Sequence, residues 1–336
     1  MSTIIDQEPQ AAPARAGSWR FPRFAFFTAL LALTGLLIFL YPGVASWFSQ
    51  YAQSQIIKSV EVSTSSAATT QREAEIDRAR AYNEALVGGA LVGANTNVPT
   101  GAGTEGGEFD YDRLLPASAD GAMARLRIPA IDVDLPIYHG TSDQTLERGV
   151  GHLQGTSLPV GGVDQHSVLT AHRGLASAEL FTHLDQVKAG EIFTIEVFGE
   201  VISYKVVETQ VVEPSETQAL YPEYGRDLVT LVTCTPLGIN SHRILVTGER
   251  ITPTPIGAIN DAGKAPDIPG FPWWAVGIGV ALALLTAYVW RMGRVGALPA
   301  PRAAAQQGWG IAPKGSGPHA DSAPEHGAAD GQGSGG

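Results

Sequence analysis

Cysteine and charge are the two features that this sequence has little of. The 336 residues include a single cysteine, which excludes an internal disulfide and a cysteine-rich zinc site. Charged residues make up only 16% of the chain, and 33 acidic against 22 basic residues give a net charge of -11. A general nucleic-acid binder needs a basic surface, so this balance argues against a nucleic-acid partner. The sparse charge instead indicates that part of the chain lies in lipid.

Two long runs, residues 24–48 and 271–290, contain no charged side chain. A helix needs about 20 apolar residues to cross the hydrocarbon layer, and both runs are that long. Arginines precede the first run and follow the second, and an excess of arginine marks the cytoplasmic side. We therefore expect a two-pass plasma-membrane protein with both termini cytoplasmic and the middle outside. The alternatives are a signal peptide cleaved near residues 44–46 and, for the second run, a buried helix.

Composition shifts divide the rest of the chain. Between 121 and 250, short β-rich runs alternate with Gly and Pro breaks, which predicts a single all-β barrel or sandwich. A helix-forming stretch at 71–87 and a Gly-rich linker at 88–107 precede it. The expected segments are a cytoplasmic tail (1–23), a membrane helix (24–48), an external helix and linker (49–120), the β domain (121–250), a Pro-rich linker (251–270), a second membrane helix (271–290) and a disordered cytoplasmic tail (291–336).

Cys234 lies at the end of a predicted strand, residues 227–233, beside a turn where a substrate could reach it. Only the thiolate is strongly nucleophilic, so a catalytic cysteine needs a nearby base or cation. Arg243 begins the next strand, and a strand, a turn and a strand would bring it back beside Cys234. There its guanidinium could hydrogen-bond a developing oxyanion. The alternatives are a buried structural cysteine and a solvated surface arginine.

Six histidines of the external region are candidates for the base: His139, His152, His166, His172, His183 and His242. His172 follows the predicted strand at 166–171 and precedes a glycine, so it also lies at a strand end. Spacing alone selects none of the six, and several could be surface groups. No His or Cys pattern has metal-ligand spacing, so we expect no metal and no cofactor.

Three separated motifs, which occur in the right order, resemble the sortase family. The stretch TLVTCTPLGIN at 230–240, followed by Arg243, is similar to the family's catalytic signature. The stretch TAHRG at 170–174 is similar to its histidine motif, and residues 135–140 and 149–159 resemble its early barrel segments. The resemblance covers essentially the whole predicted β domain. The most similar subgroup is class C, the pilus-assembling sortases, in which a membrane segment typically follows the barrel.

The resemblance implies an all-β fold: an eight-stranded sortase β-barrel with an N-terminal helical and lid extension and two flanking transmembrane helices. It implies a cysteine transpeptidase that cleaves an LPxTG-like sorting signal between Thr and Gly through a thioacyl intermediate and joins it to a pilin lysine. Cys234 would be the nucleophile, His172 the general acid and base, and Arg243 the group that positions substrate and stabilises the oxyanion. The partners would be pilin subunits and other surface proteins with sorting signals. Because Arg outnumbers Lys and Ala and Gly abound, we expect a Gram-positive envelope.

The resemblance also implies a substrate groove and a lid. Thr233 and the segment 211–226, with Leu220 and Tyr221, would bind the sorting signal. Class C members usually carry a lid with an Asp-Pro-aromatic anchor over the cysteine, and this sequence has no Asp-Pro dipeptide. We interpret the stretch that contains Phe109, Asp110, Tyr111 and Asp112 as a modified lid.

Three other functions stay open. A housekeeping sortase would join its substrate to a cell-wall peptide amine. A hydrolytic cysteine protease would release a free threonine acid without needing an amine. A non-catalytic membrane scaffold would need neither a nucleophile nor a base. The second membrane segment favours pilin polymerisation over the housekeeping role, and the three candidate catalytic residues argue against the scaffold.

Overall fold

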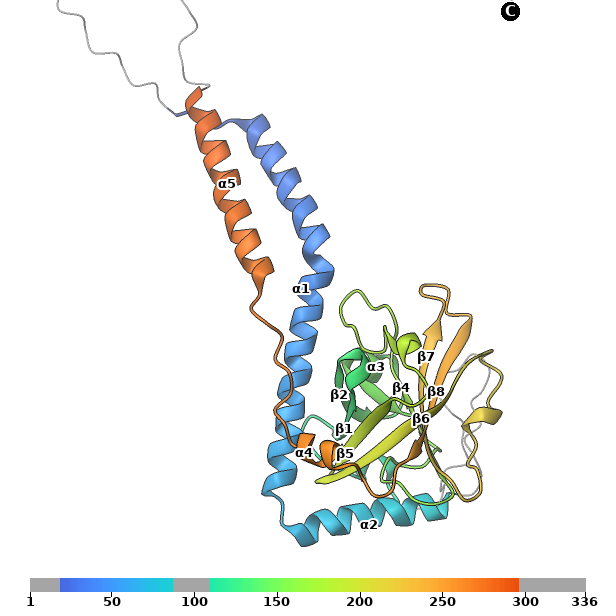
Figure 1. The fold of residues 1–336 in the computed structure, drawn as a ribbon. Helices are drawn as coiled ribbons and strands as arrows, with labels where there is room; N and C mark the ends of the chain where they lie inside the picture. Colours follow the sequence, from blue (N-terminus) through green and yellow to red (C-terminus); the bar gives the residue numbers. More distant parts are fainter. Residues whose placement is uncertain (1–18, 87–108, 296–336) are drawn as a thin grey trace, which may run out of the picture. The chain divides into compact units, whose positions relative to one another are not determined.

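Eight strands close into a barrel in the computed structural model, which describes residues 19–86 and 109–295 (Figure 1). Around the barrel the order is β1-β2-β3-β4-β7-β8-β6-β5, so the expected all-β, eight-stranded fold is confirmed. The pairs β2–β3 and β4–β7 are parallel, and the other neighbouring pairs are antiparallel. The strands are β1 (Ala122–Ile128), β2 (Val133–His139), β3 (Val150–His152), β4 (Gln165–Thr170), β5 (Ile192–Val197), β6 (Glu200–Val212), β7 (Asp227–Thr235) and β8 (His242–Arg250).

The interior of the barrel is filled by aromatic and aliphatic side chains from alternate strand positions. Phe193 of β5 and Tyr204 of β6 pair across the two strands, are fully buried and stack with ring centroids 5.5 Å apart. A Cβ added at Gly248 of β8 would lie 2.4 Å from the Phe193 ring. This position of β8 therefore requires glycine because the phenylalanine ring crosses it.

The helix that contains the first apolar run is longer than the run itself. α1 spans Arg23–Ser66, whereas the sequence predicts a membrane helix at 24–48. Ile57 and Val60, beyond the run, are buried, because the last turns of α1 pack against the barrel. The bounds differ because hydropathy identifies only the residues that suit lipid. The same helix continues beyond those residues as a more polar segment. α1 and α5 (Trp273–Val295) are both long and apolar enough to cross a membrane.

Two further helices flank the barrel. α2 (Thr69–Ala85) occupies the stretch where the sequence predicts a helix at 71–87. α4 (Ile256–Asp261) lies inside the predicted Pro-rich linker, 251–270, so that linker contains an ordered turn of helix. It begins after Pro255, whose ring fixes φ near the helical value. The remaining short elements are α3 (Asp143–Arg148), η1 (Tyr111–Arg113), η2 (Pro129–Ile131), η3 (Leu184–Gln186) and η4 (Gln218–Leu220).

Three predicted segments lie wholly or mostly outside the described residues. The tails expected at 1–23 and 291–336 are described only at 19–23 and 291–295. The Gly-rich linker expected at 88–107 is not described. The expectations for these segments therefore stay predictions. The barrel and the helices that pack on it belong to one compact unit of the chain, which begins at Pro22 and ends at Met292.

Candidate active site

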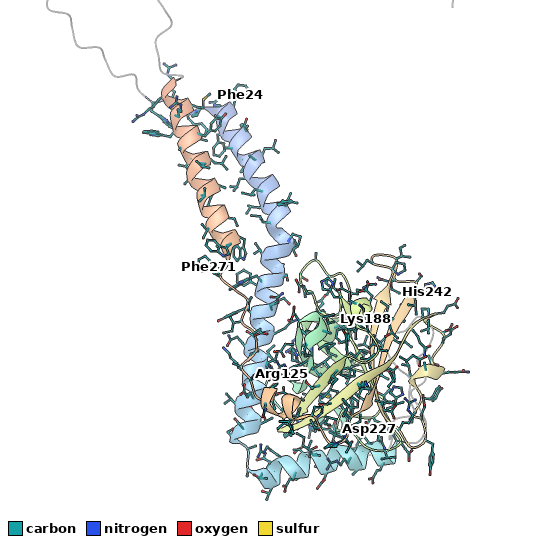
Figure 2. All side chains as sticks on the ribbon, in the orientation of Figure 1. Phe24, Arg125, Lys188, Asp227, His242 and Phe271 are labelled. Atoms are coloured by element: carbon teal, nitrogen blue, oxygen red, sulfur yellow. The ribbon has the colours of Figure 1, made fainter. Side chains whose placement is uncertain are left out.

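The β7–β8 hairpin brings Cys234 and Arg243 side by side. In the antiparallel register of the two strands, Cys234 pairs directly with Arg243. Figure 2 shows His242 at this end of the hairpin and Asp227 at the other end. Arg243 Nη1 donates to the carbonyl oxygens of Asn240 and His242 at 2.9 and 3.0 Å, which holds the guanidinium at the base of the loop. A permanent cation therefore lies one strand away from the single thiol of the chain.

His172 reaches the same place from β4. The parallel ladder of β4 and β7 pairs Thr170 with Val232, and the Ala171 N–H continues it by donating to the Val232 carbonyl at 3.2 Å. His172 comes two residues after Thr170, just past the end of β4, and Cys234 comes two residues after Val232, so the register leads both residues toward the same place. Three strand ends, those of β4 and β7 and the start of β8, thus converge on one location.

All three candidate side chains belong to the outer face of these strands. Successive side chains of a strand point to opposite faces, and in β7 Leu231 belongs to the barrel core. Val232, Val168 of β4 and Leu245 of β8 form a second, smaller apolar cluster on the other face. The histidine, the cysteine and the arginine are each an even number of residues from a member of this cluster. Cys234 and Arg243 therefore face outward, away from the core, and His172 continues the same alternation two residues past the end of β4.

Burial separates four of the other histidines from His172, which is half-buried; His139 is half-buried too, and burial lowers its pKa below the ordinary value. His152 is fully buried, and both of its ring nitrogens lie within 3.0 Å of an oxygen, so burial lowers its pKa to about 4. His166 is also buried, and burial lowers its pKa below the ordinary value. Both rings are committed to internal hydrogen bonds. The side chains exposed to solvent are those of His183 and His242.

The segment between β6 and β7 covers the same outer face. Leu220 in η4 is 9% exposed and packs into the second apolar cluster beside Val232. The neighbouring Tyr221 carbonyl accepts a hydrogen bond from His166 Nδ1 at 2.9 Å, and Thr230 lies 2.7 Å from the other ring nitrogen. The two predicted groove residues are therefore fixed to the face of β7 that also presents the thiol.

Thr233, a predicted substrate-binding residue, points to the opposite face from Cys234. Its side chain is 1% exposed, and its hydroxyl donates to the Ala171 carbonyl at 2.8 Å. A one-residue step along a strand reverses the face, which is why the neighbour of an outward cysteine turns inward. The Thr233 side chain therefore holds the backbone before His172, and it offers no open surface to a peptide.

Sequence reasoning assigns no role to Arg173 and Thr235. The structure joins them by a hydrogen bond of 2.8 Å from Arg173 Nη1 to Thr235 Oγ1. The available signal is their position, since one directly follows His172 and the other directly follows Cys234. Only the long-range pairing of β4 with β7 shows that the two residues meet.

The predicted lid residues are fastened to the barrel. Tyr111 is 7% exposed and belongs to the barrel core, where its hydroxyl lies 2.8 Å from His152 Nδ1 and accepts the Gly140 N–H at 3.1 Å. Phe109 packs edge-on against an aromatic ring of α2, and Asp110 pairs with an arginine three residues on. These contacts place the Tyr111 ring in the core, whereas the cysteine faces outward. A lid role for the stretch is not contained in these contacts and stays a prediction.

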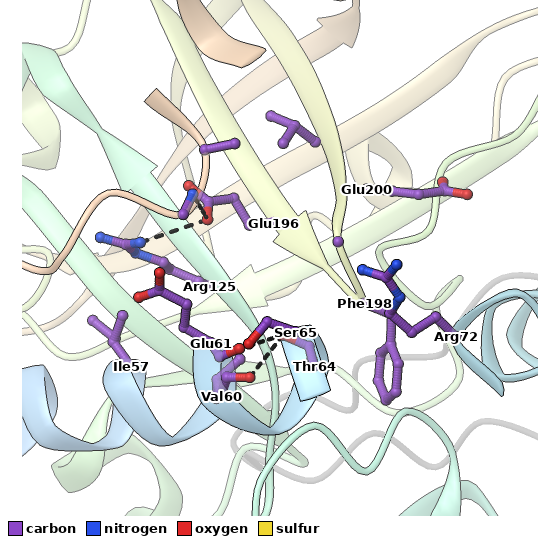
Figure 3. A pocket seen from close by; sticks show the side chains of 14 residues that line it. Ile57, Val60, Glu61, Thr64, Ser65, Arg72, Arg125, Glu196, Phe198 and Glu200 are labelled. Carbon is purple, nitrogen blue, oxygen red and sulfur yellow. Dashed lines mark hydrogen bonds and ion pairs between the residues drawn. The ribbon is translucent and has the colours of Figure 1, made fainter. Parts of the chain in front are cut away.

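A pocket of about 270 Å³, lined by both charged and apolar side chains, lies on the far wall of the barrel, where β1 is opposite β7 in the strand order (Figure 3). Arg125 of β1 is 3% exposed and makes a two-point pair with Asp134, with its shorter distance 2.6 Å. It also lies 3.5 Å from Glu196 and donates to the Lys264 carbonyl at 2.9 Å. The pocket is thus a place where the barrel fastens the segment that follows it.

Comparisons with known proteins point to one family. A sequence model described as the sortase domain matches residues 126–251. Sortase D of Bacillus subtilis is 29% identical over 137 residues, which cover 39% of this chain and 65% of that protein. The chain therefore spans slightly less than two thirds of the length of this curated relative.

Two solved structures match this chain over a larger share of both lengths. Streptococcus pneumoniae sortase C, whose structure is described as giving insights into catalysis and pilin substrate specificity, is 38% identical, with a TM-score of 0.53, over 60% of this chain and 98% of its own. A lid mutant of sortase A from Corynebacterium diphtheriae is 40% identical, with a TM-score of 0.50, over 56% of this chain and 98% of its own. Likeness at this level of identity over nearly the whole of both neighbours concerns sequence as well as fold.

Proposed function

We propose, from the premise that this chain belongs to the sortase family of cysteine transpeptidases, that Cys234, His172 and Arg243 carry the reaction. The observation that supports this assignment is the strand register, which sets the three residues at neighbouring strand ends on one outer face. A nucleophile, a base and a fixed cation in one open location are the groups that acyl transfer through a thioacyl enzyme needs.

In the first half of the reaction, the Cys234 thiolate attacks the threonine carbonyl carbon of an LPxTG-like sorting signal. A C–S bond forms, and the Arg243 guanidinium stabilises the oxyanion. When the Thr–Gly C–N bond breaks, the His172 imidazolium gives its proton to the departing glycine amine. The products are a thioacyl enzyme and the glycine-side peptide.

In the second half, an amine attacks the thioacyl carbon while neutral His172 removes a proton from it. The C–S bond breaks, the thiolate of Cys234 is restored and an amide forms. We assign the amine to a lysine of a pilin subunit, so that repeated turnover would polymerise pilin. The pilin substrate specificity described for the pneumococcal neighbour supports this assignment, and the open position of the outer face leaves room for a protein amine.

The sorting signal would lie along the outer face between the β6–β7 segment and the catalytic residues. Leu220 and Tyr221 support this placement because they are fixed on the outer face of β7 that leads to Cys234. Tyr224, which is 96% exposed in the same segment, offers an aromatic ring to an incoming peptide. Thr233 contributes here through its backbone position alone.

We also propose that α1 and α5 cross the plasma membrane, with the barrel outside and both termini inside. This orientation is supported by Arg20, just before α1, by Arg23, its first residue, and by Arg291 and Arg294 at the end of α5. Protease added to intact protoplasts should cut the barrel and spare an epitope placed at either terminus. Loss of either terminal epitope would contradict the two-pass arrangement.

The decisive experiment uses the full chain in detergent with a fluorogenic Leu-Pro-Ala-Thr-Gly peptide and an added lysine-bearing pilin. Cleavage between Thr and Gly, with the threonine carbonyl recovered as an amide, is expected. Cys234→Ala should abolish both cleavage and amide formation while the melting temperature stays the same. Polymer that survives this change would contradict the assignment of the nucleophile.

A second measurement separates the competing functions. Recovery of free threonine acid at the same rate with and without the pilin would indicate a hydrolytic protease. Polymer formed by a pilin without its acceptor lysine would exclude that lysine as the amine. Joining to a cell-wall peptide in preference to the pilin would indicate a housekeeping sortase.

A further inference from the structure

Arg173, the residue after His172, is a nearly buried cation held on three sides. Its side chain is 10% exposed. Nε donates to the Thr182 carbonyl at 3.1 Å, Nη1 donates to Thr235 Oγ1 at 2.8 Å, and Nη2 pairs with Asp185 at 2.7 Å. A planar guanidinium with three fixed partners has little freedom to move. The partners come from the β4–β5 loop and from the end of β7.

Two hydrogen bonds flank the nucleophile: the Thr233 hydroxyl donates one to a backbone carbonyl, and the Thr235 hydroxyl accepts the other from a guanidinium. Thr233 and Thr235 flank Cys234, and their hydroxyls bond to Ala171 and Arg173, the two residues that flank His172. Because side chains alternate along a strand, both hydrogen bonds lie on the face opposite to the thiol. The histidine and the cysteine are thereby tied together from behind, and their reactive sides stay open.

We infer that Arg173 is a positioning residue: through Thr235 it holds His172 at the distance and angle from Cys234 that the transpeptidation needs. The inference rests on the function proposed above. Proton transfer needs the donor and acceptor atoms within about 2.6–3.2 Å, and a misplacement of about 1 Å can cost about 100-fold in rate. Arg173 itself touches no substrate in this arrangement, since its nitrogens are occupied behind the site.

A purely structural role for Arg173 makes a different prediction. If the three bonds served only to fold the β4–β5 loop, removing one would lower the melting temperature, and activity would fall only as the folded fraction fell. If they set the catalytic geometry, kcat should fall in fully folded protein while KM changes little. The split between kcat and KM therefore separates the two roles.

Thr235→Val is the sharpest variant because it removes the hydroxyl and keeps the branched shape that suits a strand. In the full chain, with the Leu-Pro-Ala-Thr-Gly peptide, we expect kcat to fall by about 10–100-fold at nearly constant KM. Thr235→Ser keeps a hydroxyl and should restore most of kcat. Arg173→Gln should lower kcat similarly, and the double variant should lose no more than the worse single variant, because both act through one bond.

Arg127→Gln is the matched control, since Arg127 also bonds a carbonyl and a carboxylate but lies on the far wall of the barrel. It should leave kcat unchanged. Three results would overturn the inference: a wild-type kcat in Thr235→Val, a loss that follows the melting temperature, or fully additive losses in the double variant. Activity that survives both Cys234→Ala and His172→Ala would instead overturn the proposed function. Loss in those two variants alone would leave the function intact and refute the positioning role.

Discussion

Arg125 and Arg173, two arginines in different parts of the barrel, show that the structural role of a side chain depends on the partners it binds. Arg125 lies within β1, is 3% exposed, and its partners come from neighbouring strands and the segment after the barrel. Arg173 lies beyond the end of β4, and its partners join the loop after His172 to the residue after Cys234. Both are ion-paired, Arg125 in a buried position and Arg173 in a nearly buried one. The first joins parts of the scaffold, whereas the second joins the two strand ends to which we assign the chemistry.

The largest effect is expected at Arg125. Arg125→Ala would leave the half-buried Asp134 without its two-point partner and Glu196 with Arg127 alone, which should lower the free energy of unfolding by about 3 kcal/mol. Thermal unfolding followed by tryptophan fluorescence would measure it. Arg80→Ala, which breaks an exposed pair with Glu200, should cost at most about 1 kcal/mol. Equal losses in the two variants would remove the distinction between a buried clasp and a surface pair.

The buried His152 and the exposed His183 allow a similar comparison of how stability depends on pH. Burial lowers the pKa of His152 to about 4, below the value of about 6.5 in an unfolded chain. Below pH 6.5 the unfolded chain therefore binds a proton that the folded chain refuses until about pH 4. The contribution of neutral His152 to the free energy of unfolding is therefore fully present above pH 6.5. It should fall by about 3 kcal/mol as the pH drops to 4.

Melting curves at several pH values would measure this loss. His152→Gln should flatten the dependence over that window, although its stability at pH 7 will be lower. His183→Gln, which removes an exposed imidazole, is the control for a general effect of losing a histidine. A His152→Gln protein with the parent pH dependence would show that other groups cause the loss.

The catalytic side can be tested at Gly174, two residues after His172. Its φ is +75°, and an added Cβ would lie 2.4 Å from Leu237 of the β7–β8 loop. Gly174→Ala should therefore displace the Leu237 side chain, which is exposed and flexible, and strain the backbone after His172, so that kcat/KM falls by at most about tenfold. Gly121→Ala is the matched control, since Gly121 has φ +85° and open space around its Cβ position. A comparable loss in Gly121→Ala would mean that backbone strain, not the Leu237 contact, is responsible.

The pairing of Cys234 with Arg243 could be predicted from the sequence because it is local. A strand, a short turn and a strand fix which residues meet, and the register places these two opposite each other. The choice of His172 could not be derived in this way. It depends on the parallel pairing of β4 with β7, whose strands are about sixty residues apart, and only the family resemblance selected it.

Side-chain direction was the harder property. Thr233 and Tyr111 belong to stretches that the sequence identifies, yet both side chains turn to the core. The alternation of side chains along a strand places Thr233 on the face opposite to an outward Cys234, so the groove role that the family resemblance implied for its side chain conflicts with the strand itself. The end of α1 shows a related limit, because hydropathy at 24–48 carries no information about the polar turns that follow to Ser66.

The smallest effect is expected for a change at Tyr111. This change tests whether the predicted lid stretch belongs to the structural scaffold or to the active site. Tyr111→Phe keeps the ring but removes the hydroxyl that bonds His152 and Gly140, which should cost about 1 kcal/mol of stability. If the residue only anchors the stretch in the core, the rate at which a thiol reagent labels Cys234 should stay the same. If Phe109, Asp110 and Tyr111 restrain a lid over the thiol, labelling should accelerate. Because the Tyr111 ring lies in the barrel core, we expect the labelling rate of Cys234 to stay the same. Accelerated labelling would instead show that Tyr111 controls access to the thiol.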